Sequence, residues 1–113
     1  MMANIKTLEQ TLKANEFAIT AEIPAPINAS ASEMEEKIDL LTGHVHAINV
    51  TDNPGATAHM SSLAGCSIVR NKGIDPIFQV TCRDRNRLAI QSDLMGASAL
   101  GINNVLTLAG DPV

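Results

Sequence analysis

The chain has 113 residues, of which 45% are hydrophobic and only 2% aromatic, and its formal net charge is −4. This length allows one domain. The acidic balance and the scattered Lys and Arg argue against a nucleic-acid surface and a polybasic membrane patch. With neither Trp nor Tyr present, the core must be built from Ile, Leu, Val, Ala and Met, a composition that suits parallel strands covered by helices. We therefore expect an α/β protein that binds neither nucleic acid nor membrane.

The hydrophobic pattern predicts a short helix followed by alternating strands and helices. Strands are predicted at residues 17–23, 45–51, 76–81 and 104–109. Helices are predicted over residues 5–15, from 32 to 43, from 57 to 73, and in a last segment that ends at Gly101. The strand starts are spaced by roughly thirty residues, as expected of βαβ units. This order predicts a sheet whose strands are all parallel.

Local signals refine the predicted helices. Ser32 with Glu35 forms a capping-box pattern, and Thr57 is a candidate cap for the next helix. Residues at the spacing i, i+3, i+4, i+7 and i+8 are predicted to form the buried face of that next helix: Met60, Leu63, Ala64, Ser67 and Ile68. Side chains expected to point inward from the last helix are Ile90, Leu94 and Ala97. The methionines expected to fill the core are Met34, Met60 and Met95.

Neither a signal peptide nor a membrane span is predicted. The N-terminus has no long apolar segment, and no stretch approaches the length of a span. The two cysteines, Cys66 and Cys82, fall in different predicted elements without Cys-x-x-Cys spacing. This usage favours free thiols in a reducing compartment. These features predict a cytoplasmic protein.

The pattern favours a barrel over an open sheet. Parallel sheets covered by helices are either doubly wound sheets or (βα)8 barrels. The glycine-rich dinucleotide fingerprint is absent after the first strand, where residues 22–26 read EIPAP. We therefore predict a (βα)8 TIM-barrel type. A complete barrel takes about 250 residues, so we expect residues 1–113 to be its N-terminal half, with about the first four βα units.

Every predicted strand ends in a polar or turn-forming cluster. The first ends at Glu22, the second at Thr51 and Asp52, the third before Arg83, and the fourth before Asp111. Because the carboxyl ends of parallel strands meet at one edge, and active sites of barrels lie there, we expect a site at this edge.

Motifs at these strand ends occur together in one enzyme family. The segments are 20–24 (TAEIP), 49–54 (NVTDNP), 79–87 (QVTCRDRNR) and 108–112 (LAGDP). In this order and spacing they resemble methylenetetrahydrofolate reductases, most closely the bacterial and archaeal branch with the Arg-Asp-Arg-Asn-Arg segment. The resemblance extends from the first strand to the last residue. It implies a flavoprotein that reduces 5,10-methylenetetrahydrofolate to 5-methyltetrahydrofolate in one-carbon metabolism and methionine biosynthesis, with FAD relaying a hydride from NADH or NADPH.

The resemblance also implies roles for individual residues. Glu22 would be the general acid that protonates a folate ring nitrogen. Asp111 would lie beside the pyrimidine edge of the flavin and also meet the folate. Thr51 would touch the nicotinamide or the folate, while Asp52 and Pro54 would line the flavin.

Two positions depart from the family pattern. Gln79 stands where several relatives have His, so a contact with the flavin ring is retained but a proton role is not. Ala109 stands where many relatives have Arg, so only a backbone contact is implied there. Gly110 would permit close approach of the backbone to the flavin.

The basic and histidine residues allow alternative readings. The run of Arg83, Arg85 and Arg87 would suit a phosphate or the polyglutamate tail of folate, but we favour a solvated helix start paired with Asp84 and Asp93. A metal site at His44 and His46 would need further ligands at the wrong end of the barrel, so no metal is expected. His59 is expected on a helix surface.

Alternatives to a complete enzyme remain open. Because the missing half would carry most contacts to FAD, we expect this chain to be inactive alone. It would otherwise be a non-catalytic half-barrel that self-associates through its unpaired edge strands, or a pterin-binding methyltransferase barrel that binds folate without flavin. Besides the folate substrate, the expected partners are further copies of the chain and, as in some relatives, an iron–sulfur partner subunit.

Overall fold

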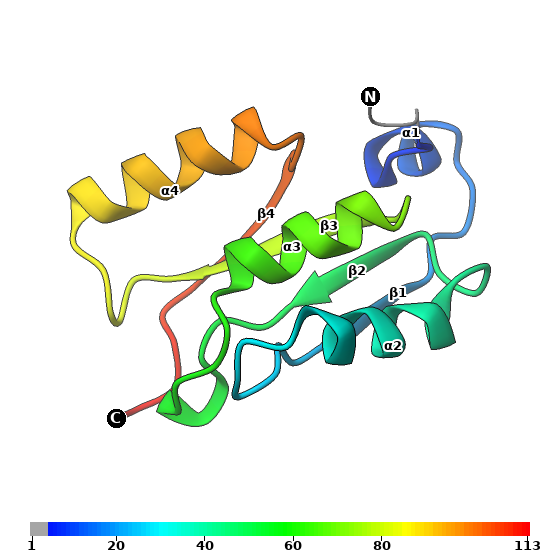
Figure 1. Ribbon diagram of the computed structural model, residues 1–113. Coiled ribbons are helices and arrows are strands. Elements are labelled where there is room, and N and C mark those ends of the chain that lie inside the picture. The colour runs from blue at the N-terminus through cyan, green and yellow to red at the C-terminus, as the bar shows by residue number, and fades with distance from the viewer. Residues whose placement is uncertain (1–4) are drawn as a thin grey trace.

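The computed structural model describes residues 5–113 and contains a sheet of four parallel strands in the order β1-β2-β3-β4 (Figure 1). The strands are β1 (Thr20–Ile23), β2 (Ala47–Val50), β3 (Asp75–Thr81) and β4 (Asn104–Leu108). The helices are α1 (Leu8–Lys13), α2 (Ala31–Leu41), α3 (Ser62–Asn71) and α4 (Arg87–Ala99), with a short 3₁₀ turn, η1 (Pro54–Ala56). The predicted α/β fold of partial TIM-barrel type is confirmed.

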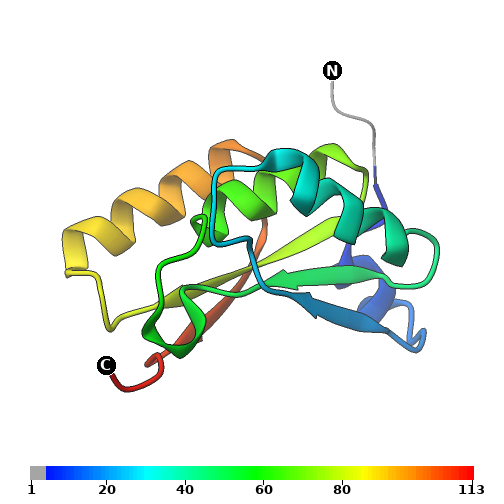
Figure 2. The same cartoon turned by 60° about the horizontal axis from the view of Figure 1, so that its bottom comes forward.

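Helices α2, α3 and α4 all lie on one face of the sheet, as Figure 2 shows from a second direction. Helix α1 lies instead at the end of the sheet where the strands begin (Figure 1). It is attached there because the backbone N–H of Leu8 donates to Asp75 Oδ2 at 2.6 Å. Among the described residues, therefore, none of the four α-helices covers the edge where the strands end.

The core lies between the sheet and the three covering helices. Phe78, Ile48 and Val50 are fully buried on the helix side of the sheet, against Met34 and other aliphatic side chains. Helix α3 approaches β2 so closely that a Cβ at Gly65 would lie 2.7 Å from Val50 Cγ1. This position therefore requires glycine, even though glycine lowers the intrinsic stability of a helix interior.

The other face of the sheet carries the polar strand residues. The register aligns Glu22 with Asn49 and Asn49 with Ile77, and side chains at aligned positions point to the same face. Since side chains alternate along a strand, Thr51 and Gln79 lie on this face as well. It is therefore the face opposite the helices that leads to the predicted site.

Two of the predicted helix starts are wrong. Ser30 caps α2, since its hydroxyl accepts the backbone N–H of Glu33 at 3.2 Å, and Ser61 caps α3. Residues 57–60, predicted as the first turn of α3, form a loop instead because the backbone N–H of Met60 donates to the carbonyl of Pro26 at 2.8 Å. His59 therefore lies in this loop and not on a helix.

The buried face of α3 is offset by two positions from the predicted one, which places it on nearly the opposite side of the helix. The residues that are buried are Ser62, Gly65, Cys66 and Val69, whereas Ala64 is exposed. The physical reason is the close approach at Gly65, which turns the smallest residues towards β2. Periodicity favoured the side with the larger apolar residues, but Leu63 and Ile68 are only half-buried, at the margin of the core.

The inward side chains of α4 were only partly predicted. Ala97 is buried and Ile90 is half-buried, but Leu94 is exposed. Met34 fills the core as predicted, whereas Met95 is 69% exposed and does not. The apolar spacing therefore overestimated the buried face of α4, since Leu94 is 36% exposed and Met95 points largely to solvent.

Cys66 and Cys82 are free thiols, as predicted. Burial raises the pKa of the Cys66 thiol to about 12, so it stays protonated and unreactive near neutral pH.

His46 has a structural contact, since its Nδ1 accepts the backbone N–H of Ile19 at 2.9 Å. Residues 5–113 contain no cluster of three side chains suited to a metal ion. None of the described helices has the length and apolar character needed to cross a membrane.

Candidate functional site

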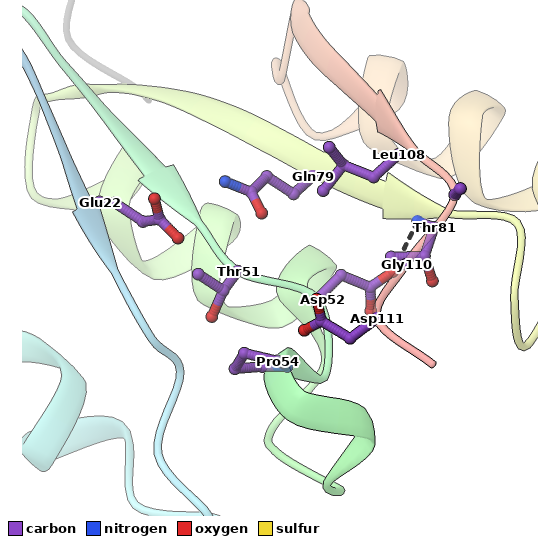
Figure 3. A pocket seen from close by; sticks show the side chains of 10 residues that line it. Glu22, Thr51, Asp52, Pro54, Gln79, Thr81, Leu108, Gly110 and Asp111 are labelled. Carbon is purple, nitrogen blue, oxygen red and sulfur yellow. Dashed lines mark hydrogen bonds between the residues drawn. The ribbon is translucent and has the colours of Figure 1, made fainter. Parts of the chain in front are cut away.

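The polar strand ends meet in a single cleft of about 400 Å³ at the carboxyl edge of the sheet (Figure 3). Its lining comprises residues from the ends of all strands: Glu22, Thr51, Asp52, Pro54, Gln79, Thr81, Leu108, Ala109, Gly110 and Asp111. Every residue for which a site role was predicted is in this set. Thr81 and Leu108 were not predicted. Both are the last residues of their strands and lie inside the strand-end segments 79–87 and 108–112, and this position was the signal that would have identified them.

Three polar side chains in the cleft are free to meet a ligand. Glu22 is exposed at the end of β1, and its carboxylate has no hydrogen-bond partner within residues 5–113. The side-chain amide of Gln79 projects into the cleft (Figure 3). Its backbone carbonyl accepts a hydrogen bond from the Ser62 hydroxyl at 2.8 Å. Thr51 is 6% exposed, and its hydroxyl is buried without a partner among the described residues.

The Thr51 hydroxyl is the least expected of these three. Buried polar groups in proteins are nearly always hydrogen-bonded, because leaving one unpaired costs about 1–3 kcal/mol. A hydroxyl that is buried at the floor of a cleft and lacks a partner is consistent with a group that a ligand satisfies.

Asp52 differs from these three because both of its carboxylate oxygens are hydrogen-bonded within the protein. One carboxylate oxygen accepts the backbone N–H of Thr81 at 2.8 Å, the dashed line in Figure 3, and both oxygens accept hydrogen bonds from Arg85. Burial alone would raise the pKa of Asp52, but the hydrogen bonds from Arg85 and Thr81 outweigh it and lower that pKa below its usual value. The side chain is 1% exposed, so its charge is available to Arg85 rather than to a ligand.

Arg83 joins the loops that follow three strands. It donates to the carbonyl of Asn53 at 3.1 Å after β2 and to the carbonyl of Asp111 at 3.0 Å after β4. Asp111 returns to the β2 loop, since its Oδ2 accepts the backbone N–H of Gly55 at 2.8 Å. These contacts fix the wall of the cleft that faces Glu22.

One comparison with known proteins decides the family. The family model described as methylenetetrahydrofolate reductase matches residues 7–113. The chain belongs to the methylenetetrahydrofolate reductase family. The resemblance inferred from the strand-end motifs is thereby confirmed, and membership indicates an oxidoreductase of this reductase type.

In this reductase-family chain the basic run behaves differently from the prediction. Arg83 pairs with Asp84 and Arg85 pairs with Asp93, as predicted. The start of α4 is exposed at Arg87, as predicted, but Arg83 and Arg85 precede the helix and their side chains are only 10% and 14% exposed. Both guanidinium groups are directed into the loops around the cleft. Neither is available for the phosphate or polyglutamate contact considered from the sequence.

The cleft depends on contacts that the sequence did not reveal. Arg85 and Asp52 are 33 positions apart, and Arg83 and Asp111 are 28 positions apart. Only the adjacency of β2, β3 and β4 in the sheet brings these pairs together. The signal that was available is that Asp52 and Asp111 follow the two strands on either side of β3, and that Arg83 and Arg85 follow β3 within a few residues.

Proposed function

We propose that this cleft binds the isoalloxazine ring of FAD together with 5,10-methylenetetrahydrofolate, and that the protein reduces this folate to 5-methyltetrahydrofolate. We further propose that residues 1–113 are the N-terminal half of the (βα)8 barrel in which this occurs. The observation that carries the proposal is one cleft with the Glu22 and Asp111 carboxylates on opposite sides and the unpartnered Thr51 hydroxyl between them (Figure 3). Family membership supports it.

The cleft residues fit a flavin ring. Such a ring presents carbonyl oxygens and ring nitrogens along its edge, and the Thr51 hydroxyl and Gln79 amide supply both donors and acceptors. Gly110 lines the cleft and has no side chain, so its backbone allows a ring to approach closely. Since Gln79 cannot titrate, it would orient the ring without moving a proton. When bound, FAD supplies the relay of a hydride from NADH or NADPH to the folate.

Glu22 is suited to protonate the folate. Its carboxyl group is in the cleft and has no partner among residues 5–113, so it is free to hydrogen-bond a ring nitrogen of a bound folate and to transfer a proton there. Protonation opens the five-membered folate ring to a reactive cation. A positioned general acid of this kind contributes roughly 10²–10⁴-fold to a rate.

Asp111 is suited to stabilise that cation. The Gly55 N–H fixes one carboxylate oxygen, and the carboxyl group lines the cleft. A fixed negative charge is most effective where positive charge develops in the transition state. Asp52 would have a structural role instead, because its carboxylate is bound to Arg85. Any contact of Asp52 with the flavin would involve its backbone, next to Pro54.

Replacing Thr51 by Val in the complete barrel tests the cleft as a binding site. We expect the dissociation constant of FAD to rise about fivefold to tenfold, because one hydrogen bond is worth about 1 kcal/mol. The free energy of unfolding should rise or stay unchanged, since an unpaired buried hydroxyl is removed. FAD fluorescence quenching and urea unfolding measure the two quantities.

Thr107→Val is the matched control, because Thr107 is exposed on β4 and outside the cleft. It should leave FAD affinity unchanged. If Thr51→Val lowered stability and left FAD affinity intact, the Thr51 hydroxyl would be structural and the proposed site would be refuted. Retained folate binding without any flavin binding would favour a pterin-binding methyltransferase.

A second candidate function is self-association through the sheet edges. Within the described residues β1 and β4 are edge strands, and the β4 side chains Val105, Leu106 and Leu108 are 43%, 42% and 38% exposed. Exposed apolar edges of this kind favour pairing with another chain. If residues 1–113 self-associate, light scattering will give a dimeric or larger mass; a monomeric mass at all concentrations would exclude it. A homo-oligomer of the complete barrel and an iron–sulfur partner subunit remain predictions.

A further inference from the structure

We propose that Arg83 is a positioning residue for Asp111, holding the loop after β4 so that the Asp111 carboxylate faces the cleft. This inference rests on the proposed function. The guanidinium group of Arg83 lies behind the loop and does not line the cleft. It therefore acts through Asp111 and not by touching a ligand.

The loop after β4 has few other attachments. The ladder between β3 and β4 ends at the pair Thr81 and Leu108, followed by one hydrogen bond from the Cys82 N–H to the Leu108 carbonyl. Beyond that point, within the described residues, residues 109–113 are held by polar contacts from Arg83 and Gly55, apart from a weak 4.0 Å contact of the Cys82 thiol. Its conformation therefore depends on side chains and not on the sheet.

Arg83 is built to hold this loop in one place. Its side chain is 10% exposed, and it bridges the carbonyls of Asn53 and Asp111 while Asp84 neutralises its charge. Hydrogen bonds from a charged donor are about twice as strong as neutral ones. The bridge also sets the distance between the loops after β2 and β4, which are the loops that carry Thr51 and Asp111.

Gly110 makes the contact specific. A Cβ at this position would lie 3.0 Å from Arg83 Cβ and 3.4 Å from Arg83 Nη1, so the loop backbone rests directly on the arginine. The positive φ of +91° of Gly110 then turns Asp111 back towards Gly55. The placement of the Asp111 carboxylate therefore requires both the Arg83 side chain and the side-chain-free backbone of Gly110.

The test compares Arg83→Gln with Arg87→Gln in the complete barrel. Arg87 belongs to the same basic run, but its side chain is exposed and makes no contact with the loop after β4. For Arg83→Gln we expect a roughly tenfold to hundredfold loss of kcat for folate reduction. We also expect faster amide hydrogen exchange of residues 109–113 and a smaller loss in Arg83→Lys. Arg87→Gln should change none of these.

A double-mutant cycle shows whether Arg83 acts through Asp111. In an Asp111→Asn background, Arg83→Gln should cost less than threefold in kcat, because the group that it positions is already neutral. A full additional loss in that background, or unchanged amide exchange at residues 109–113, would overturn the inference even if folate is reduced. Absence of folate reduction in the unsubstituted barrel would instead refute the proposed function, and this inference with it.

Discussion

Glu22→Gln in the complete barrel is expected to remove folate reduction while leaving reduction of the flavin by the nicotinamide donor intact. Glutamine keeps the shape of the side chain but has no proton to deliver to the folate ring nitrogen. The loss should be roughly 10²–10⁴-fold, the usual contribution of a general acid. Both half-reactions can be followed anaerobically by the visible absorbance of the flavin, so one preparation reports on the two steps separately.

The matched control is Glu36→Gln on the exposed side of α2, which should leave both half-reactions unchanged. Folate turnover that survives Glu22→Gln would show that another group supplies the proton. Equal loss of both half-reactions would show instead that Glu22 supports binding of the flavin. In either case the acid role derived from the open carboxylate of Glu22 would be wrong.

Asp52→Asn is expected to lower the free energy of unfolding by about 3 kcal/mol, the usual range for breaking a buried ion pair. The substitution leaves Arg85 with Asp93 as its remaining carboxylate partner, and Arg85 is only 14% exposed. Asp39→Asn provides the comparison: it breaks an exposed pair with Lys72 and should cost less than about 1 kcal/mol. Urea unfolding measures both variants, and equal costs would contradict the structural role of Asp52.

The same ion pair predicts a pH dependence. The pKa of Asp52 in the folded protein is lower than its ordinary value of 3.8, so its contribution to stability is fully present above that value. As the pH falls below 3.8 towards the folded-state pKa, the contribution is lost. Unfolding curves measured between pH 5 and the acid limit should therefore converge for the wild type and Asp52→Asn. Curves that stay parallel through this range would show that Asp52 does not titrate as described.

The sheet was predictable because its signals are local. Each strand has an apolar run that ends in a polar or turn-forming cluster, and each strand is separated from the next by a helical pattern. The starts of α2 and α3 were less predictable, since several Ser and Thr residues compete as caps. Tertiary contacts decided between them. The hydrogen bond from Met60 to the Pro26 carbonyl, for example, keeps the residues after Thr57 out of the helix.

The positions of the site residues were predictable for the same reason, but their environments were not. Parallel strands place Glu22, Thr51 and Asp111 at one edge of the sheet, regardless of which contacts their side chains make. Whether a carboxylate there is free or engaged depends on partners about thirty positions away, as with Asp52 and Arg85. No local pattern shows that Glu22 is open to the cleft whereas Asp52 is enclosed.

The most direct test of the central claim is a single anaerobic measurement on the complete barrel. FAD bound to the protein is first reduced, and 5,10-methylenetetrahydrofolate is then added while the flavin absorbance is recorded. A cleft with Glu22 and Asp111 facing a bound flavin and folate predicts that the oxidised flavin spectrum returns and that 5-methyltetrahydrofolate forms in equal amount. If the flavin stays reduced, or if FAD never binds, the cleft described here is not the site of this reaction.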